Sequence, residues 1–189
     1  MLVARKGIDV TELIYKRDES GYRFALGELG ERNLICVGLN PSRAEPGDYD
    51  PTMKRVENWA IMHGNDGHIM VNLYPQRATK PSRMDDSAHL NKSMVHKNLE
   101  CISRLFEVAD FDVWAAWGAN VGKRRNSHLL DSLSQIWRAF EKRGGDFDAK
   151  WFRLGDLTSA DHPRHPLRVA YSEDPVEFDV DLYLKRLGY

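Results

Sequence analysis

The apolar run at residues 34–37 ends in Gly38 and the tetrapeptide Leu39-Asn40-Pro41-Ser42, and this abrupt change limits the folds open to the chain. A continuous apolar run of this length is typical of a strand that is buried on both faces, as in sheets covered by helices. Pro41 has no backbone N–H and cannot continue a sheet ladder, so we expect the strand to end where Asn40 emerges. Because ligands of open α/β sheets bind at the carboxyl ends of strands, the tetrapeptide predicts a binding edge.

Three further extended segments end in polar or small residues: Val71-Asn72-Leu73, Ala116-Trp117-Gly118 and His165-Pro166-Leu167. Apolar residues recur at helical spacing near residues 51–63, 92–108 and 129–140, and a closing helix is expected at about 175–187. Strands that alternate with helices predict an α/β fold, a three-layer α/β/α sandwich with a mostly parallel central sheet. We expect one domain over residues 1–189, with its core motifs at about 22–170.

The composition excludes several classes of protein. No apolar run approaches the roughly 20 residues that span a bilayer, and the first residues lead into no long apolar segment, so we expect a cytoplasmic protein that contacts no membrane. Cys36 and Cys101 lie within apolar patterns, and we expect them to be reduced core residues, too few for a metal cluster.

The basic residues are distributed less evenly than the formal net charge of −1 indicates. Lys123, Arg124 and Arg125 follow the segment that ends in Gly118, and Arg164 and Arg168 flank the last extended segment. These side chains either form a basic rim around a site or are ordinary solvated loop charges. A net charge near zero gives no strong long-range attraction to nucleic acid.

Six motifs occur in an order that resembles a bacterial family catalogued only as a domain of unknown function: Asn40-Pro41-Ser42-x-Ala44, Asp50-Pro51-Thr52, Val71-Asn72-Leu73, Arg77-Ala78-Thr79, Ala116-Trp117-Gly118 and His165-Pro166-Leu167. The resemblance covers roughly residues 22–170. It implies no activity by itself.

The same motifs are similar, more distantly, to those of the uracil-DNA glycosylase superfamily. Gly38-Leu39-Asn40-Pro41 matches the Gly-x-Asn-Pro form of its first motif, and Asn72 is followed by Arg77 and Pro81 as in its second. Gly118 and His165-Pro166 match the two later positions. This resemblance implies a uracil-DNA-glycosylase-like fold that hydrolyses the N-glycosidic bond of a modified or damaged base in DNA, with no metal or cofactor.

The resemblance also implies roles for single residues. Asn40 would hold the attacking water, and Asp50 or Asp48, in the loop that follows, would act as the general base. His165 would stabilise the departing nucleobase, an effect worth roughly 3 kcal/mol. Asn72 would bind the polar edge of the base, and Tyr74 or Trp117 would stack on its face at about 1–3 kcal/mol. The other expected substrate-binding residues are Gly38, Pro41, Ser42, Arg77 and Gly118, and the expected nucleic-acid-binding residues are Lys123, Arg124, Arg125, Arg164 and Arg168.

Each of these residues has a structural alternative. Asn40 can cap the loop that begins at Pro41, and Asp50 can serve only as the N-cap of the following helix. His165 lies in an extended, proline-flanked stretch that need not be catalytic. Asn72 can be a buried structural residue. The others have plain roles as well: Trp117 as a core residue and Arg77 as a solvated loop arginine.

Two departures from the superfamily pattern bear on the reaction. An asparagine at position 40, in place of the aspartate of the fastest glycosylases, implies slow chemistry or a different substrate. Leu167 replaces the serine of the last motif, which usually contacts a phosphate. Two rivals therefore stay open: a hydrolase or transferase of free nucleosides or nucleotides, and a non-catalytic module that binds nucleic acid or nucleotides. The sequence does not determine the base, the strandedness or the oligomeric state.

Overall fold

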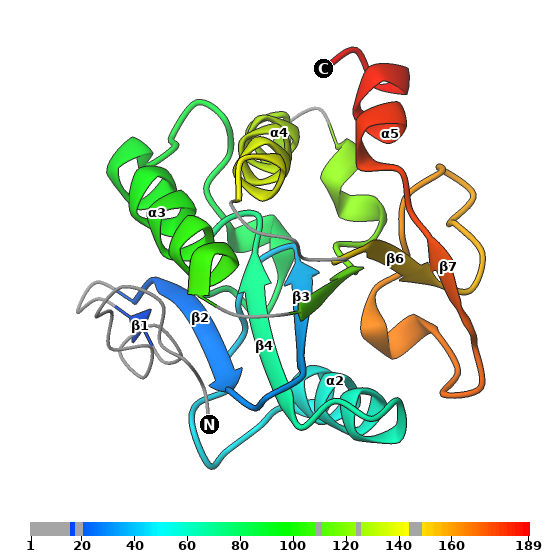
Figure 1. Cartoon of the computed structure of the whole chain (residues 1–189). Coiled ribbons are helices and arrows are strands. Elements are labelled where there is room, and N and C mark those ends of the chain that lie inside the picture. Colours follow the sequence, from blue (N-terminus) through cyan, green and yellow to red (C-terminus); the bar gives the residue numbers. More distant parts are fainter. Residues whose placement is uncertain (1–15, 18–20, 109–110, 124–125, 144–148) are drawn as a thin grey trace.

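In the computed structural model, the described residues are 16–17, 21–108, 111–123, 126–143 and 149–189, and within them seven strands form one sheet (Figure 1). The strands lie in the order β1 (Lys16–Arg17), β2 (Arg23–Glu28), β4 (Gly67–Asn72), β3 (Asn33–Gly38), β5 (Phe111–Ala115), β6 (Trp151–Leu154) and β7 (Pro175–Glu177). The predicted α/β class is confirmed. The apolar run at 34–37 forms the centre of β3, as predicted, and β3 lies between β4 and β5.

The sheet is mixed, so the prediction of a mostly parallel sheet is wrong. The four central strands β4, β3, β5 and β6 are parallel, whereas the pairs β1–β2, β2–β4 and β6–β7 are antiparallel. The short turn at residues 29–32 reverses the chain between β2 and β3, so β2 runs against the central strands. A parallel pair needs a long crossover connection, which in this chain is helical only between the central strands.

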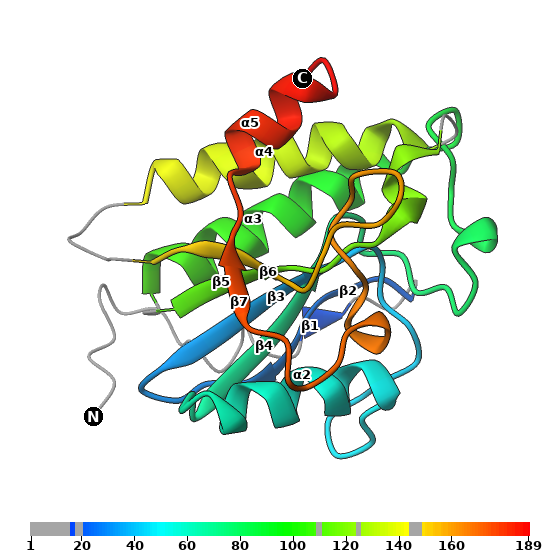
Figure 2. The same cartoon turned by 90° about the vertical axis from the view of Figure 1, so that its right-hand side faces the viewer.

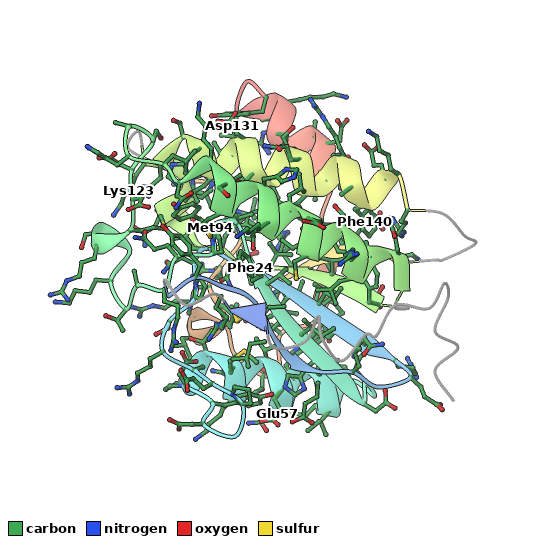
Figure 3. The ribbon with its side chains drawn as sticks, turned by 90° about the vertical axis from the view of Figure 1, so that its left-hand side faces the viewer. Phe24, Glu57, Met94, Lys123, Asp131 and Phe140 are labelled. Atoms are coloured by element: carbon green, nitrogen blue, oxygen red, sulfur yellow. The ribbon has the colours of Figure 1, made fainter. Side chains whose placement is uncertain are left out.

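Helices cover both faces of the sheet (Figure 2). Helix α2 (Pro51–Met62) lies on one face, and α3 (Lys92–Val108), α4 (His128–Glu141) and α5 (Val180–Arg186) lie on the other. All six residues of β3 are buried because alternate side chains contact opposite layers: Leu34 and Cys36 pack with α2, and Ile35 and Val37 pack with α3 and α4. Figure 3 labels Phe24 of β2 and Met94 of α3, which belong to the hydrophobic cluster between the sheet and helices α3 and α4.

The C-terminal segment differs from the expected helix at about 175–187. Residues Pro175–Glu177 pair with β6 as strand β7, and α5 begins only at Val180. Asp179 sets this boundary, because its side chain accepts a hydrogen bond from the backbone N–H of Leu182 and so caps the helix. The segment at His165–Leu167 is likewise not a strand, since Pro166–Arg168 form one turn of 3-10 helix, η4.

Cys36 and Cys101 are both buried, as expected, and burial raises the pKa of the Cys36 thiol far above its ordinary value. No helix in the described part of the chain has both the length and the apolar character required to cross a bilayer. Nor do any three His, Cys, Asp or Glu side chains of the described residues lie together as a set that could hold a metal ion.

Candidate functional site

A cleft of about 1040 Å³ lies beyond the carboxyl ends of β3 and β5, at the edge where the sequence predicted a site. Five segments form most of it: the loop after β3, the start of α2, the loop after β4, the residues after β5, and the stretch before and within η4. Arg23 of β2 and Met70 of β4 also line it. Its walls contain eight of the predicted site residues, namely Asn40, Ser42, Asp50, Trp117, Gly118, Arg164, His165 and Arg168. The fold therefore brings together residues that are more than 120 positions apart in the chain.

Asn40 holds the first wall of the cleft in place. Its amide nitrogen Nδ2 donates to the carbonyl oxygens of Pro41 at 3.0 Å and Ala78 at 2.8 Å, and lies 3.4 Å from that of Gln76. Only the nitrogen of an asparagine side chain can donate to a carbonyl, so these contacts fix the orientation of the amide. No described residue bonds to Oδ1, and this oxygen is the acceptor that Asn40 can present to the cleft.

Asp50 caps helix α2, as predicted. Its Oδ1 accepts hydrogen bonds from the backbone N–H groups of Thr52 and Met53, both at 3.0 Å. The second carboxylate oxygen, Oδ2, bonds to no residue in the described part of the chain, and Asp50 lines the cleft. The same side chain can therefore start the helix through one oxygen and offer the other to a ligand or a water.

His165 is held as a neutral imidazole. The backbone N–H of Leu167 donates to its Nδ1 at 3.3 Å, so the ring proton of the neutral form is on Nε2. Burial is the main cause that lowers the pKa of His165; the negative charge of Asp50 opposes this and Arg168 adds to it. The imidazole can therefore act as a hydrogen-bond donor at neutral pH without carrying a positive charge.

Gly118 connects two walls of the cleft, here called the far walls: the residues after β5 and the segment that carries His165. Its backbone N–H donates to the carbonyl of Pro163 at 3.0 Å, and a Cβ built on it would lie 3.5 Å from the Cβ of His165. Its backbone has φ +72° and ψ 176°, a combination that essentially only glycine adopts. The predicted glycine thus has a conformational reason to be there.

Replacing Gly118 with alanine is expected to lower the free energy of unfolding by about 1–3 kcal/mol, because a residue with a Cβ is strained at these angles. The added methyl group itself meets only an ordinary contact with His165, so backbone strain and not a clash is the cause. Urea unfolding at pH 7 measures the change. A midpoint equal to that of the parent would contradict the backbone conformation described for Gly118.

The charged side chains of the cleft are mostly basic. Arg23, Arg43, Arg164 and Arg168 line it, against the single carboxylate of Asp50. Arg164 is oriented by a hydrogen bond from its Nε to the carbonyl of Asp156 at 2.7 Å, whereas Arg43 and Arg168 are exposed. The basic-rim interpretation of Arg164 and Arg168 stays a prediction, but both residues lie where it requires.

Sequence reasoning missed Arg23 and Arg43. Arg23 is only 2% exposed, and its Nη1 donates to the carbonyl of Ala44 at 2.6 Å, beneath the loop that follows β3. The available signal was an arginine directly before the apolar residues Phe24–Leu26, since a charge buried at the start of such a strand has to meet polar partners. Arg43 gave no signal beyond its position two residues after Pro41.

Other predicted substrate-binding residues lie behind the cleft or beside it. Arg77 donates to the carbonyls of Ser42 and Arg43 and pairs with Glu45 at 3.0 Å, so it fastens the loop after β3. Tyr74 is buried, and its hydroxyl donates to Asp85 at 2.7 Å. Burial is the largest cause that raises the pKa of Tyr74, and the hydrogen bond to Asp85 is the next largest.

Gly38, Pro41 and Asn72 are buried and are not among the residues that line the cleft. Asn72 is fully buried, and neither of its side-chain polar atoms has a hydrogen-bond partner among the described residues. A side chain at Gly38 would collide with Met70 and with Asn72, which explains the glycine by packing. Lys123 is exposed (Figure 3) and does not line the cleft, and Arg124 and Arg125 lie outside the described residues.

A protein-family model described as "Protein of unknown function (DUF1643)" matches residues 23–167. No curated protein and no solved structure gives a significant match. The matched span runs from the start of β2 into η4 and contains all the segments that form the cleft apart from Arg168. The predicted membership of a family of unknown function is confirmed, and the likeness to uracil-DNA glycosylases stays a prediction.

Proposed function

The chain belongs to the DUF1643 family of proteins of unknown function, so its activity has to be inferred from the cleft, and we propose that it is a DNA glycosylase-like enzyme. It would hydrolyse the N-glycosidic bond of a modified or damaged base, within a uracil-DNA-glycosylase-like fold. One observation carries the proposal: Asn40, Asp50 and His165 come from three separate segments and line one cleft. Two of them offer acceptor oxygens, and the third offers a neutral N–H donor.

The proposed reaction follows from these three groups. A water that donates to Asn40 Oδ1 and to Asp50 has a lone pair left to form a bond to the anomeric carbon of the sugar. As that bond forms, the bond from this carbon to the base nitrogen breaks, and its electron pair leaves with the base. Asp50 accepts the proton of the water, and His165 Nε2–H stabilises the negative charge on the base. The base anion then takes a proton from solvent and Asp50 releases its proton to solvent, which leaves the free base, an abasic sugar and the enzyme in its starting state.

The basic residues of the cleft favour DNA over a free nucleoside as the substrate. Contacts to phosphates dominate the affinity of proteins for DNA. Arg43 and Arg168 line the cleft and are exposed, so they are accessible to the phosphates of a DNA strand. A flipped-out nucleotide also needs a concave pocket, which the cleft provides. A free nucleoside has no phosphate for these arginines to bind.

The test is a screen for base release with the Asp50→Asn variant beside the parent. Labelled oligonucleotides carry uracil, hypoxanthine, xanthine or bulky modified pyrimidines, in single- and double-stranded form. Asparagine caps a helix about as well as aspartate, so the variant keeps α2 and loses only the carboxylate that accepts the proton of the water. We expect a loss of about 10²- to 10⁴-fold in the rate of base release, with little change in melting temperature.

The matched control is Asp179→Asn, the same substitution at the N-cap of α5, away from the cleft. It should release base at the rate of the parent. Equal rates for Asp50→Asn and the parent would remove Asp50 from the mechanism. Release from free nucleosides or nucleotides alone would favour the first rival, and binding without any release would favour a non-catalytic module.

A further inference from the structure

Helix α5 lies beyond the residues that the family model matches, yet its buried Tyr183 bonds to both far walls of the cleft. The indole Nε1 of Trp117 donates to the Tyr183 hydroxyl at 3.3 Å. The same hydroxyl lies 2.7 Å from Nδ1 of His162. Trp117 directly precedes Gly118 and itself lines the cleft, and His162 lies three residues before His165.

The direction of these hydrogen bonds follows from the donors available. Indole nitrogen can only donate, so the Tyr183 oxygen accepts from Trp117. Among the described residues, the Tyr183 hydroxyl contacts no other hydrogen-bond partner. Its hydrogen therefore points to His162 Nδ1, which accepts it. Burial raises the pKa of Tyr183 to about 12, which keeps the phenol protonated, and burial lowers the pKa of His162, which keeps Nδ1 an acceptor.

We infer that Tyr183 is a positioning residue, whose hydroxyl fixes the distance between the strand end at Gly118 and the segment that carries His165. The backbone bond from Gly118 N–H to the Pro163 carbonyl, at 3.0 Å, spans the same gap and reports on it directly. Without the hydroxyl, Trp117 and His162 each lose a buried partner, and the two walls lose their common anchor. The effect on catalysis rests on the proposed function, whereas the effect on the walls does not.

The test compares Tyr183→Phe with Tyr189→Phe. Phenylalanine keeps the ring contacts of Tyr183 with Trp117 and Phe178 and removes only the hydroxyl. Tyr189 supplies the matched control, because it follows α5 and its hydroxyl donates to the Ser127 carbonyl, away from the cleft. Hydrogen exchange of the Gly118 amide, followed by NMR, should become at least about 10-fold faster in Tyr183→Phe and stay unchanged in Tyr189→Phe.

A second pair of variants tests the acceptor. In His162→Asn the side-chain oxygen replaces Nδ1 and should keep Gly118 exchange near that of the parent, whereas His162→Leu should match Tyr183→Phe. With an active parent, Tyr183→Phe should lower kcat about 10-fold and change KM less than twofold. If the parent releases no base but Gly118 exchanges faster in Tyr183→Phe, the exchange result supports the positioning role. The inactivity of the parent then counts against the proposed function. Unchanged Gly118 exchange in Tyr183→Phe would overturn the inference, whatever its activity.

Discussion

Replacing Asn40 with aspartate is expected to lower the free energy of unfolding by about 3 kcal/mol at pH 7 and to reduce activity, although the two side chains have nearly the same shape. The amide nitrogen of Asn40 donates to the carbonyls of Pro41 and Ala78. A carboxylate has no hydrogen to donate and would place a negative oxygen against these carbonyl oxygens. The Pro41 carbonyl still accepts the backbone N–H of Ala78 at 2.8 Å, so the Ala78 carbonyl is the one that loses its donor. That loss costs about 1–3 kcal/mol, and the repulsion between the carboxylate and both carbonyl oxygens adds to it.

The order of three variants makes this prediction specific. Asn40→Ala removes the donor without adding a charge, so it should be destabilised less than Asn40→Asp. Asn58→Asp is the control, because Asn58 is exposed on α2, and its change should stay within about 0.5 kcal/mol. Urea unfolding of all three beside the parent gives the free energies. Asn40→Asp with the stability of the parent would show that the amide does not hold this loop.

This role of Asn40 gives a physical reason for the asparagine at a position where the resemblance implied slow chemistry. The amide both anchors the loop and leaves one oxygen for the cleft, and an aspartate can do only the second. The sequence already placed Asn40 at the end of a buried strand, because an apolar run followed by proline marks such an end. It could not show that Ala78, 38 residues away, receives the hydrogen bond, since that contact depends on the loop after β4.

Two of the residues that sequence reasoning placed well, Asn40 and Gly118, follow strand ends, which apolar patterns, proline and glycine mark locally. His165 also lines the cleft, but it precedes the 3-10 turn η4 and does not directly follow a strand. Tyr74 and Arg77 show the limit. Both follow a strand end as well, but Asp85 turns the tyrosine inward and the loop carbonyls hold the arginine. Such partners come from tertiary packing, which a local pattern does not contain.

The mixed sheet shows the same limit at the level of topology. The apolar runs of β3 and β4 predicted central strands correctly, because only strands covered on both faces are apolar throughout. The direction of β2 and β7 depends on which neighbour each strand meets, and β2 pairs with β4 instead of β3, its neighbour in the chain. Local alternation of apolar and polar residues does not specify that neighbour.

Acidification below about pH 6.5 is expected to destabilise the protein well before its carboxylates titrate, because three of its histidines are buried in neutral form. His68, His128 and His162 are each at most 5% exposed, and burial is the largest cause that lowers the pKa of each. Nearby carboxylates oppose the shift without reversing it: Glu57 and Glu28 at His68, Asp131, Asp85 and Asp86 at His128, and Asp161 at His162.

The direction follows from which state binds the protons. In the unfolded chain these histidines titrate near pH 6.5, whereas in the folded protein they bind protons only at lower pH. Their contribution is therefore complete above pH 6.5 and is lost as the pH falls toward the folded pKa values. The limiting slope is about 1.4 kcal/mol per pH unit for each histidine, so the three together can remove up to about 4 kcal/mol by pH 5.5.

His68→Phe isolates one third of this effect. The His68 ring packs edge-on against Tyr49 at a centroid distance of 5.6 Å, and its Nε2 has no hydrogen-bond partner in the described part of the chain, so phenylalanine suits the site. The variant should flatten the pH dependence by up to about 1.4 kcal/mol per pH unit and unfold at higher urea than the parent at pH 5.5. His96→Gln, at an exposed histidine of α3, is the matched control for removing a histidine that is not buried. Parallel stability curves for His68→Phe and the parent between pH 7.5 and 5 would mean that His68 takes up its proton in the folded state as readily as in the unfolded chain.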